Sequence, residues 1–192
     1  MISLKPYLAL AACLLAGVAA AQTEDEGGLS RSLELPAHKA LQSVIARSDT
    51  ELALFATDGC SGGLSRVWDL VAETFPDFQD THDNEPPWQG CCVTHDRAYH
   101  NAGEAQDAAA SFSARLRADQ ALRGCVIETA DTRMDDLIAL YDVEEGQVRS
   151  AYNTIAGAMY LAVRFGGAPC SGLPWRWGYG YPQCSVLTGA FD

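Results

Sequence analysis

The segment Cys91–His100, which reads CCVTHDRAYH, places the strongest constraint on what this chain can fold into. Two prolines precede the segment and Gly103 follows it, so a helix can begin and end there. On that helix Cys91, His95 and Tyr99 follow one another at intervals of one turn and share a face. Asp96 points about 100° away from His95, toward a different partner. The segment therefore predicts a helix that is anchored by cysteines and carries a titratable base beside a carboxylate.

Residues 1–21 are typical of a secretory signal peptide, because Lys5, an apolar run and Ala19-Ala20-Ala21 follow one another before Gln22. The stretch ending at Cys13 also resembles a bacterial lipoprotein box, but the apolar run continues past it. We therefore expect a secreted or periplasmic protein. In the mature chain we expect a flexible arm over residues 22–35 and one domain over residues 36–192.

The cysteines that remain after the leader form an even set, which predicts disulfides in an oxidising compartment. They are Cys60, Cys91, Cys92, Cys125, Cys170 and Cys184. Their spacing alone leaves the pairing open. A zinc site of Cys91, Cys92, His95 and His100 is the alternative, although adjacent cysteines chelate one metal poorly and export favours oxidation.

The remaining sequence predicts a mainly α domain, because its apolar residues recur with the helical period and no strand pattern stands out. The helices are expected over residues 36–47, 64–75, 107–129, 134–141 and 148–165. Residues 77–88 and 170–184 are expected to be loops. The tryptophans either contact a lipid interface or pack on the domain itself.

Asp119 lies within the apolar stripe of the helix expected over residues 107–129. An ionised carboxylate at such a position is costly unless a partner pairs with it. His95 is the natural partner if the two helices pack antiparallel. If a bridge joins Cys91 to Cys125, His95 lies about 6 Å along one helix axis and Asp119 about 9 Å along the other. We expect the Nδ1 edge of the imidazole to face this carboxylate.

The pattern Cys-Cys-x-x-His-Asp-x-x-Tyr, followed by an acid shortly before a further cysteine, resembles the secreted phospholipase A2 superfamily. The Asp58-Gly59-Cys60 loop is closer to its bacterial and fungal members. In the animal enzymes the positions of Ala98 and Ala118 are cysteines bonded to each other, and here both are alanine. The resemblance covers residues 57–125 and, more weakly, residues 151–165.

The resemblance implies a disulfide-stapled phospholipase A2-like domain with two antiparallel catalytic helices and a calcium loop. His95 would be the general base, Asp119 would orient its ring, and Tyr99 would hydrogen-bond the same carboxylate. The implied disulfides are Cys91–Cys125 and Cys60–Cys92, which leaves Cys170–Cys184. The implied Ca²⁺ ligands are Asp58, Gly59, Ser61, Gly63 and Asp96.

These expectations lead to a monomeric, calcium-dependent enzyme that hydrolyses the sn-2 ester of glycerophospholipids, acting on phospholipid at a membrane interface. The net charge of −12 argues against nucleic acid as a partner. The alternative is a catalytically silent domain of the same fold that binds lipid or protein. The connection between Cys60 and Cys91 is longer than in the animal enzymes, so residues 64–88 are expected to reshape the cleft. His82, in a second Thr-His-Asp triplet, and His100 are expected at the surface.

Overall fold

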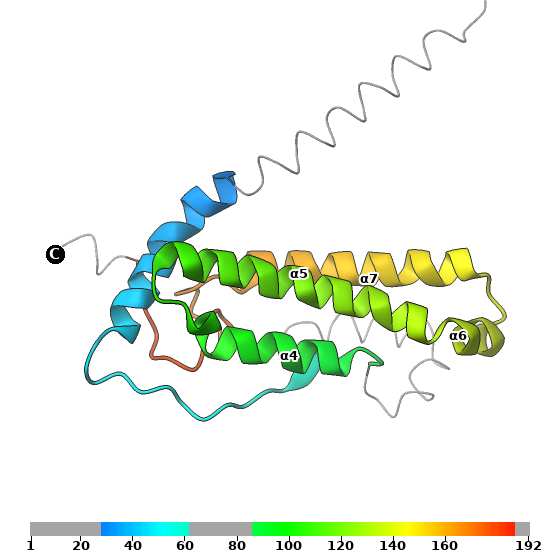
Figure 1. Cartoon of the computed structure of the whole chain (residues 1–192), viewed down its shortest axis with the longest axis horizontal. Helices are drawn as coiled ribbons and strands as arrows, with labels where there is room; N and C mark the ends of the chain where they lie inside the picture. The colour runs from blue at the N-terminus through cyan, green and yellow to red at the C-terminus, as the bar shows by residue number, and fades with distance from the viewer. Residues whose placement is uncertain (1–27, 62–85, 187–192) are drawn as a thin grey trace, which may run out of the picture.

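The computed structural model describes residues 28–61 and 86–186, and within these ranges the chain is helical and contains no strand (Figure 1). The helices are an N-terminal helix over residues 28–45, α4 (Gln89–His100), α5 (Ala108–Thr132), α6 (Met134–Tyr141) and α7 (Glu145–Gly166), with the short turns η1 (Gly59–Ser61) and η2 (Ala102–Glu104). The expected mainly α class is confirmed. The helix expected over residues 64–75, most of the reshaped connection and His82 lie outside the described residues.

Helix α5 lies between α4 and α7 and contacts both (Figure 1). The short α6 reverses the chain, so that α7 returns along α5. The N-terminal helix crosses the bundle at the end opposite α6, and the segment after it approaches α4 (Figure 1). This arrangement places side chains from three parts of the sequence around the middle of α4.

Local capping explains where the helices begin and end. The Asp107 carboxylate accepts a hydrogen bond from the Ala110 amide at 2.8 Å and starts α5. The Glu144 amide donates to Gln147 Oε1 at 2.9 Å at the start of α7. Gly103 has a φ of 63°, which lets the chain turn after α4. The expected bounds of α5, α6 and α7 are correct to within a few residues.

The aromatic tail after α7 packs on the domain and holds the C-terminal end of α4. The Gly178 amide donates to the Tyr99 carbonyl at 2.6 Å, and the Gly180 amide donates to the His100 carbonyl at 3.1 Å. Trp177 is fully buried with its ring 5.0 Å from that of Tyr99. Trp88 is buried as well. For these two tryptophans, packing on the domain is the correct interpretation.

Two sequence-based expectations are wrong. His100 is buried rather than exposed, because the tail covers it and its ring lies between those of Phe55 and Tyr179. Residues 28–35 belong to a helix rather than to a loose arm, and Pro36 lies within that helix instead of starting it. The cause is tertiary, since Glu34 on this helix enters a buried ionic network at the candidate site.

Three disulfides hold the described chain together: Cys60–Cys92, Cys91–Cys125 and Cys170–Cys184. These are the pairs that the resemblance implies. The first joins the loop at η1 to α4, the second joins α4 to α5, and the third closes the tail. Bridges of this kind are compatible with an extracellular or periplasmic protein.

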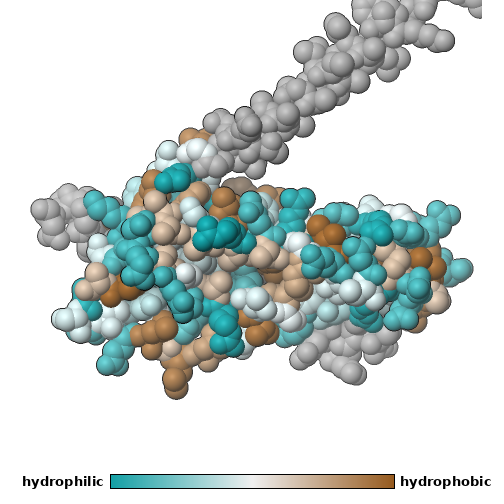
Figure 2. All heavy atoms as spheres, viewed as in Figure 1, coloured by the Kyte–Doolittle hydropathy of each residue, from teal (hydrophilic) through white to brown (hydrophobic). Residues whose placement is uncertain are grey.

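The described helices include none with the length and apolar composition needed to span a bilayer. Hydrophilic side chains cover much of the face in Figure 2, where the apolar ones stand in separate groups. The most exposed large apolar side chains include Leu54 at 95% and Phe165 at 85%.

Removal of the Cys91–Cys125 bridge by C91A/C125A should lower the free energy of unfolding by about 3 to 4 kcal/mol, because the bridge closes a loop with a sequence separation of 34. C170A/C184A opens a loop with a separation of only 14 and should cost less, about 3 kcal/mol. Urea unfolding under non-reducing conditions measures both. An equal or reversed order would contradict the assigned roles of the two bridges.

Candidate active site

His95 and Asp119 meet in the buried interface between α4 and α5. The Nε2–H of His95 donates to Asp119 Oδ1 at 2.9 Å, and the carboxylate is completely buried. The residues are therefore paired as the helix spacing predicts. The expected ring orientation is wrong, because Nε2 rather than Nδ1 faces Asp119. With Nε2 carrying the proton, the lone pair on Nδ1 is available as a base.

Tyr99 holds the same carboxylate from one turn further along α4. Its hydroxyl donates to Asp119 Oδ1 at 2.7 Å. Burial, together with the nearby Asp119 charge, raises the pKa of Tyr99 well above its usual value, so the hydroxyl stays protonated and remains a donor. His95 and Tyr99 thus fix one oxygen of Asp119 from one side.

The ionisation of His95 is set by competing effects. Burial alone would lower its pKa, but the hydrogen bonds that the ring donates to Asp119 and Asp96, with the negative charges of these carboxylates, outweigh burial. The pKa of His95 is therefore raised above 6.5. A raised pKa makes the imidazole a stronger base than a free histidine, which suits a group that accepts a proton near neutral pH.

Two arginines complete the surroundings of Asp119, the buried Arg115 and the partly buried Arg164, and the sequence analysis missed both. Arg164 on α7 donates from Nη1 to Asp119 Oδ2 at 3.0 Å. Arg115 on α5 places Nε 4.0 Å from the same oxygen and donates from Nε to the Tyr99 hydroxyl at 3.1 Å. The spacing of Arg115 and Asp119, one helical turn apart, was a signal that could have revealed the first of them. Arg164, on a separate helix, gave no local signal.

Glu34 of the N-terminal helix pairs with both arginines. One of its oxygens bonds Arg115 Nη1 and the other bonds Arg164 Nη2. Its carboxylate also lies 3.6 Å from Nε2 of His38. Burial would raise the pKa of Glu34, but the His38 hydrogen bond and the charges of Arg115 and Arg164 lower it to about 2. Ionic contacts therefore join the N-terminal helix to Asp119.

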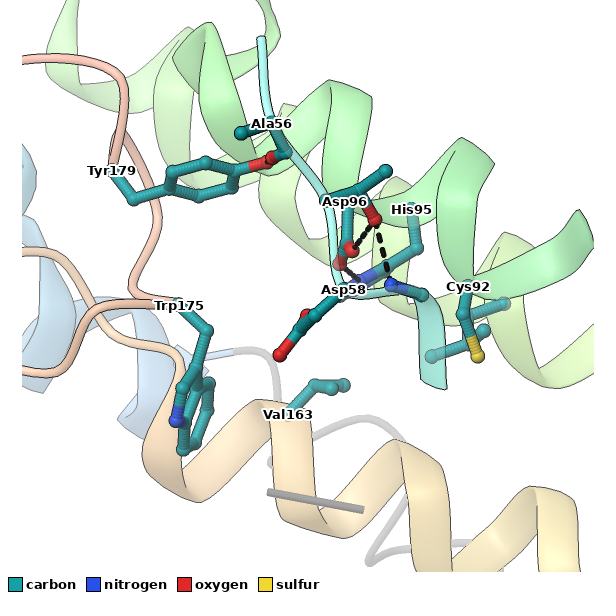
Figure 3. A pocket seen from close by; sticks show the side chains of 11 residues that line it. Ala56, Asp58, Cys92, His95, Asp96, Val163, Trp175 and Tyr179 are labelled. Carbon is teal, nitrogen blue, oxygen red and sulfur yellow. Dashed lines mark hydrogen bonds and ion pairs between the residues drawn. The ribbon is translucent and has the colours of Figure 1, made fainter. Parts of the chain in front are cut away.

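His95 also lines a pocket of about 300 Å³ (Figure 3). Leu122, Val163 and Trp175 provide an apolar wall, whereas Asp58 and Asp96 provide carboxylates. The full set of lining residues is Ala56, Thr57, Asp58, Gly59, Cys92, His95, Asp96, Leu122, Val163, Trp175 and Tyr179. The pocket thus combines a base, two acids and an apolar surface.

Asp96 is held beside the loop that precedes η1. Its Oδ2 accepts from the Thr57 hydroxyl at 2.5 Å, and its Oδ1 lies 3.9 Å from His95 Nδ1. Asp58 extends from the same loop into the pocket (Figure 3). Burial is the largest of the effects that raise the pKa of Tyr179 to about 12, and the negative charges of Asp96 and Asp58 add to it. The two carboxylates therefore create a negative field at this end of the pocket.

The backbone of the loop is shaped at Gly59, whose φ is 65°. A Cβ there would lie 2.0 Å from Gln89 Nε2, and Gln89 Oε1 accepts from the Cys60 amide at 3.1 Å. Glycine is thus required both by conformation and by space. Together with the Cys60–Cys92 bridge, these contacts hold the loop against α4.

The donor set fits a hard cation such as Ca²⁺, because Asp58 and Asp96 supply carboxylate oxygens and the loop supplies carbonyls. Among the expected ligands, Asp58, Gly59 and Asp96 line one pocket, and Ser61 lies at the end of η1. Gly63 is outside the described residues. No cluster of three or more His, Cys, Asp or Glu side chains suited to a metal occurs in the described ranges. Backbone carbonyls are thus needed to complete any site.

The zinc alternative is excluded for its proposed ligands. Cys91 and Cys92 are each consumed by a disulfide, and a disulfide sulfur is not a thiolate ligand. His100 is buried beneath the tail, away from the pocket lining.

The chain matches no family model, no curated protein and no solved structure in the three comparisons made.

Acid should weaken the fold through Glu34. Because the pKa of Glu34 is lowered from 4.5 to about 2 on folding, its contribution to stability is complete above pH 4.5 and is lost as the pH falls toward 2. Partial solvation of the carboxylate limits this contribution to on the order of 2 kcal/mol. E34Q should be less stable than wild type at pH 7 and should lose less stability between pH 5 and pH 3.

Urea unfolding at several pH values between these limits measures the effect, and E51Q is the matched control because Glu51 is exposed. Equal pH dependence of E34Q and wild type would contradict the assignment of a buried ionic role to Glu34.

Proposed function

We propose that the chain is a secreted, calcium-dependent phospholipase A2 that hydrolyses the sn-2 ester of glycerophospholipids. The observation that carries this proposal is the orientation of His95. Its Nε2 binds the buried Asp119, while the ring also lines a pocket that contains Asp58 and Asp96. A base held in this way beside a set of oxygen ligands suits hydrolysis of an ester by water.

In this mechanism Nδ1 of His95 accepts a proton from the water that attacks the ester carbonyl. The imidazolium that forms is stabilised by Asp119, whose charge is fixed by Tyr99 and Arg164. His95 then returns the proton to the leaving alcohol, so that fatty acid and lysophospholipid are released. No nucleophilic serine is needed, because the water itself attacks.

Asp96, Asp58 and the carbonyls of Gly59, Ser61 and Gly63 would hold Ca²⁺. When bound, this ion supplies positive charge that polarises an ester carbonyl and pairs with a phosphate group. Asp96 is suited to the role because Thr57 and the Cys60–Cys92 bridge fix it against the loop. The neighbouring His95 therefore acts at a defined position relative to the loop.

The apolar part of the pocket supports a lipid as the substrate. Leu122, Val163 and Trp175 give the pocket an apolar lining that suits an acyl chain. Leu54 and Phe165 are highly exposed, and each lies two residues along the chain from a pocket residue, Ala56 and Val163 respectively. Apolar side chains at these positions favour contact with a membrane interface, where the substrate is found.

H95Q should abolish hydrolysis, lowering kcat by roughly a thousandfold or more, because glutamine cannot act as the base. The assay measures release of fatty acid from sn-2-labelled phosphatidylcholine vesicles, with Ca²⁺ and with a chelator. H82Q is the control, since His82 stands in the same Thr-His-Asp triplet without the cysteine anchors.

Hydrolysis that survives H95Q, or that never depends on Ca²⁺, would contradict the proposed mechanism. Binding of the same vesicles without any hydrolysis by the wild-type protein would instead favour the silent lipid-binding alternative.

D96N should raise the Ca²⁺ concentration needed for half-maximal activity by roughly tenfold to a hundredfold, because one negative ligand is lost. Calcium titration by calorimetry measures the binding directly. D49N is the control, because Asp49 is exposed and pairs with Arg47 on the surface. Unchanged calcium affinity in D96N would remove Asp96 from the ligand set.

A further inference from the structure

Arg115 and Arg164, the two arginines beside Asp119, both bond the carboxylate of Glu34, which does not line the pocket. Arg164 reaches Asp119 with Nη1 and uses Nη2 to bond Glu34 Oε1 and, at 3.0 Å, Ser30 Oγ. Arg115 bonds Glu34 Oε2 with Nη1. Glu34 thus touches both cations that face Asp119, without touching Asp119 or His95.

We infer that Glu34 is a positioning residue for the reaction: by pairing with both Arg115 and Arg164 it offsets one of their two positive charges, which limits how far they draw the negative charge of Asp119 away from His95. This inference rests on the proposed function. It extends the site to the N-terminal helix, which the motif around His95 does not include.

The argument is one of charge balance. This network contains two carboxylates, Glu34 and Asp119, and two guanidinium groups, so it is neutral while His95 is neutral. Without the Glu34 charge, two cations would face the single carboxylate of Asp119. They would draw it away from His95 and oppose the imidazolium that forms when His95 accepts a proton.

Arg115 cannot relieve this imbalance by moving into solvent, and the side chain of Arg164 is only 10% exposed. Arg115 is fully buried, and its Nη2 is bound to the carbonyls of Val163 and Arg164, each at 2.8 Å. Its Nε is bound to the Tyr99 hydroxyl. A change at Glu34 is therefore transmitted to the pair of His95 and Asp119 rather than absorbed by the surface.

Glu34 does not line the pocket, so its loss should affect the reaction step and not substrate binding. E34Q should lower kcat by roughly tenfold to a hundredfold and leave KM within about twofold of wild type. E34D, which keeps the charge, should recover part of the loss. E51Q, a neutralised exposed glutamate, should behave as wild type.

A second variant separates positioning from a merely structural role. E34Q/R115Q removes one carboxylate and one guanidinium and restores the balance, although it also breaks the bonds of Arg115 to backbone. We expect the double variant to be less stable than E34Q but several times more active. Thermal unfolding measures the stability and the vesicle assay measures kcat. Activity that simply follows stability through the series overturns the inference.

Nitrogen-15 NMR of the His95 ring provides a readout that does not need turnover. In wild type and E51Q the Nε2–H that bonds Asp119 should give a downfield proton resonance, and in E34Q this resonance should move upfield or disappear. If the wild-type protein hydrolyses no phospholipid, the proposed function fails while this spectrum still decides the role of Glu34. An E34Q protein with the wild-type resonance and the wild-type kcat overturns the inference that Glu34 positions the pair of His95 and Asp119.

If E34Q does not fold, the double variant takes its place. Its balanced charge predicts a folded protein with kcat within roughly tenfold of wild type and with the downfield resonance retained. A folded double variant with neither this kcat nor the downfield resonance would overturn the inference.

Discussion

The buried charge of Asp119 is the constraint around which the described part of this molecule is arranged. A carboxylate removed from water must be compensated by hydrogen bonds and opposite charge. Three helices supply the compensation: His95 and Tyr99 come from α4, Arg164 comes from α7, and Arg115 lies one turn away on α5 itself. A fourth helix contributes Glu34, which balances the arginines. The same contacts therefore form the site and pack the helices against one another.

The disulfides make this arrangement rigid where it matters for the pocket. Adjacent cysteines at the start of α4 point to different partners, so one bridge fastens α4 to α5 and the other fastens it to the loop at η1. As a result, His95 and Asp96 on α4, Asp119 on α5 and Asp58 in the loop are all held at defined positions relative to α4. The described helices are thus held together by these covalent links and by the ionic network.

Much of this could be predicted locally. The intervals of Cys91, His95 and Tyr99 predict a shared helix face, and Asp119 stands out because an acid interrupts an apolar stripe. The bounds of α5, α6 and α7 follow from periodicity and capping residues. The arginines were missed for opposite reasons: Arg115 was hidden in a stripe interpreted as apolar, and Arg164 looked like one of the polar residues of an amphipathic helix. Glu34 was assigned to a flexible arm because residues 22–32 are mostly polar.

The sequence by itself determined that the chain is helical, is cross-linked by cysteines, and carries a histidine and an acid on one helix, an acid in the glycine loop and an acid buried on another helix. These features depend on residue type and on short intervals along the chain. Tertiary structure decided which imidazole nitrogen meets Asp119, that His100 lies beneath the tail, and that the N-terminal helix closes the ionic network. Those outcomes depend on the approach of segments that are far apart in sequence. No local pattern encodes the direction from which a partner side chain arrives.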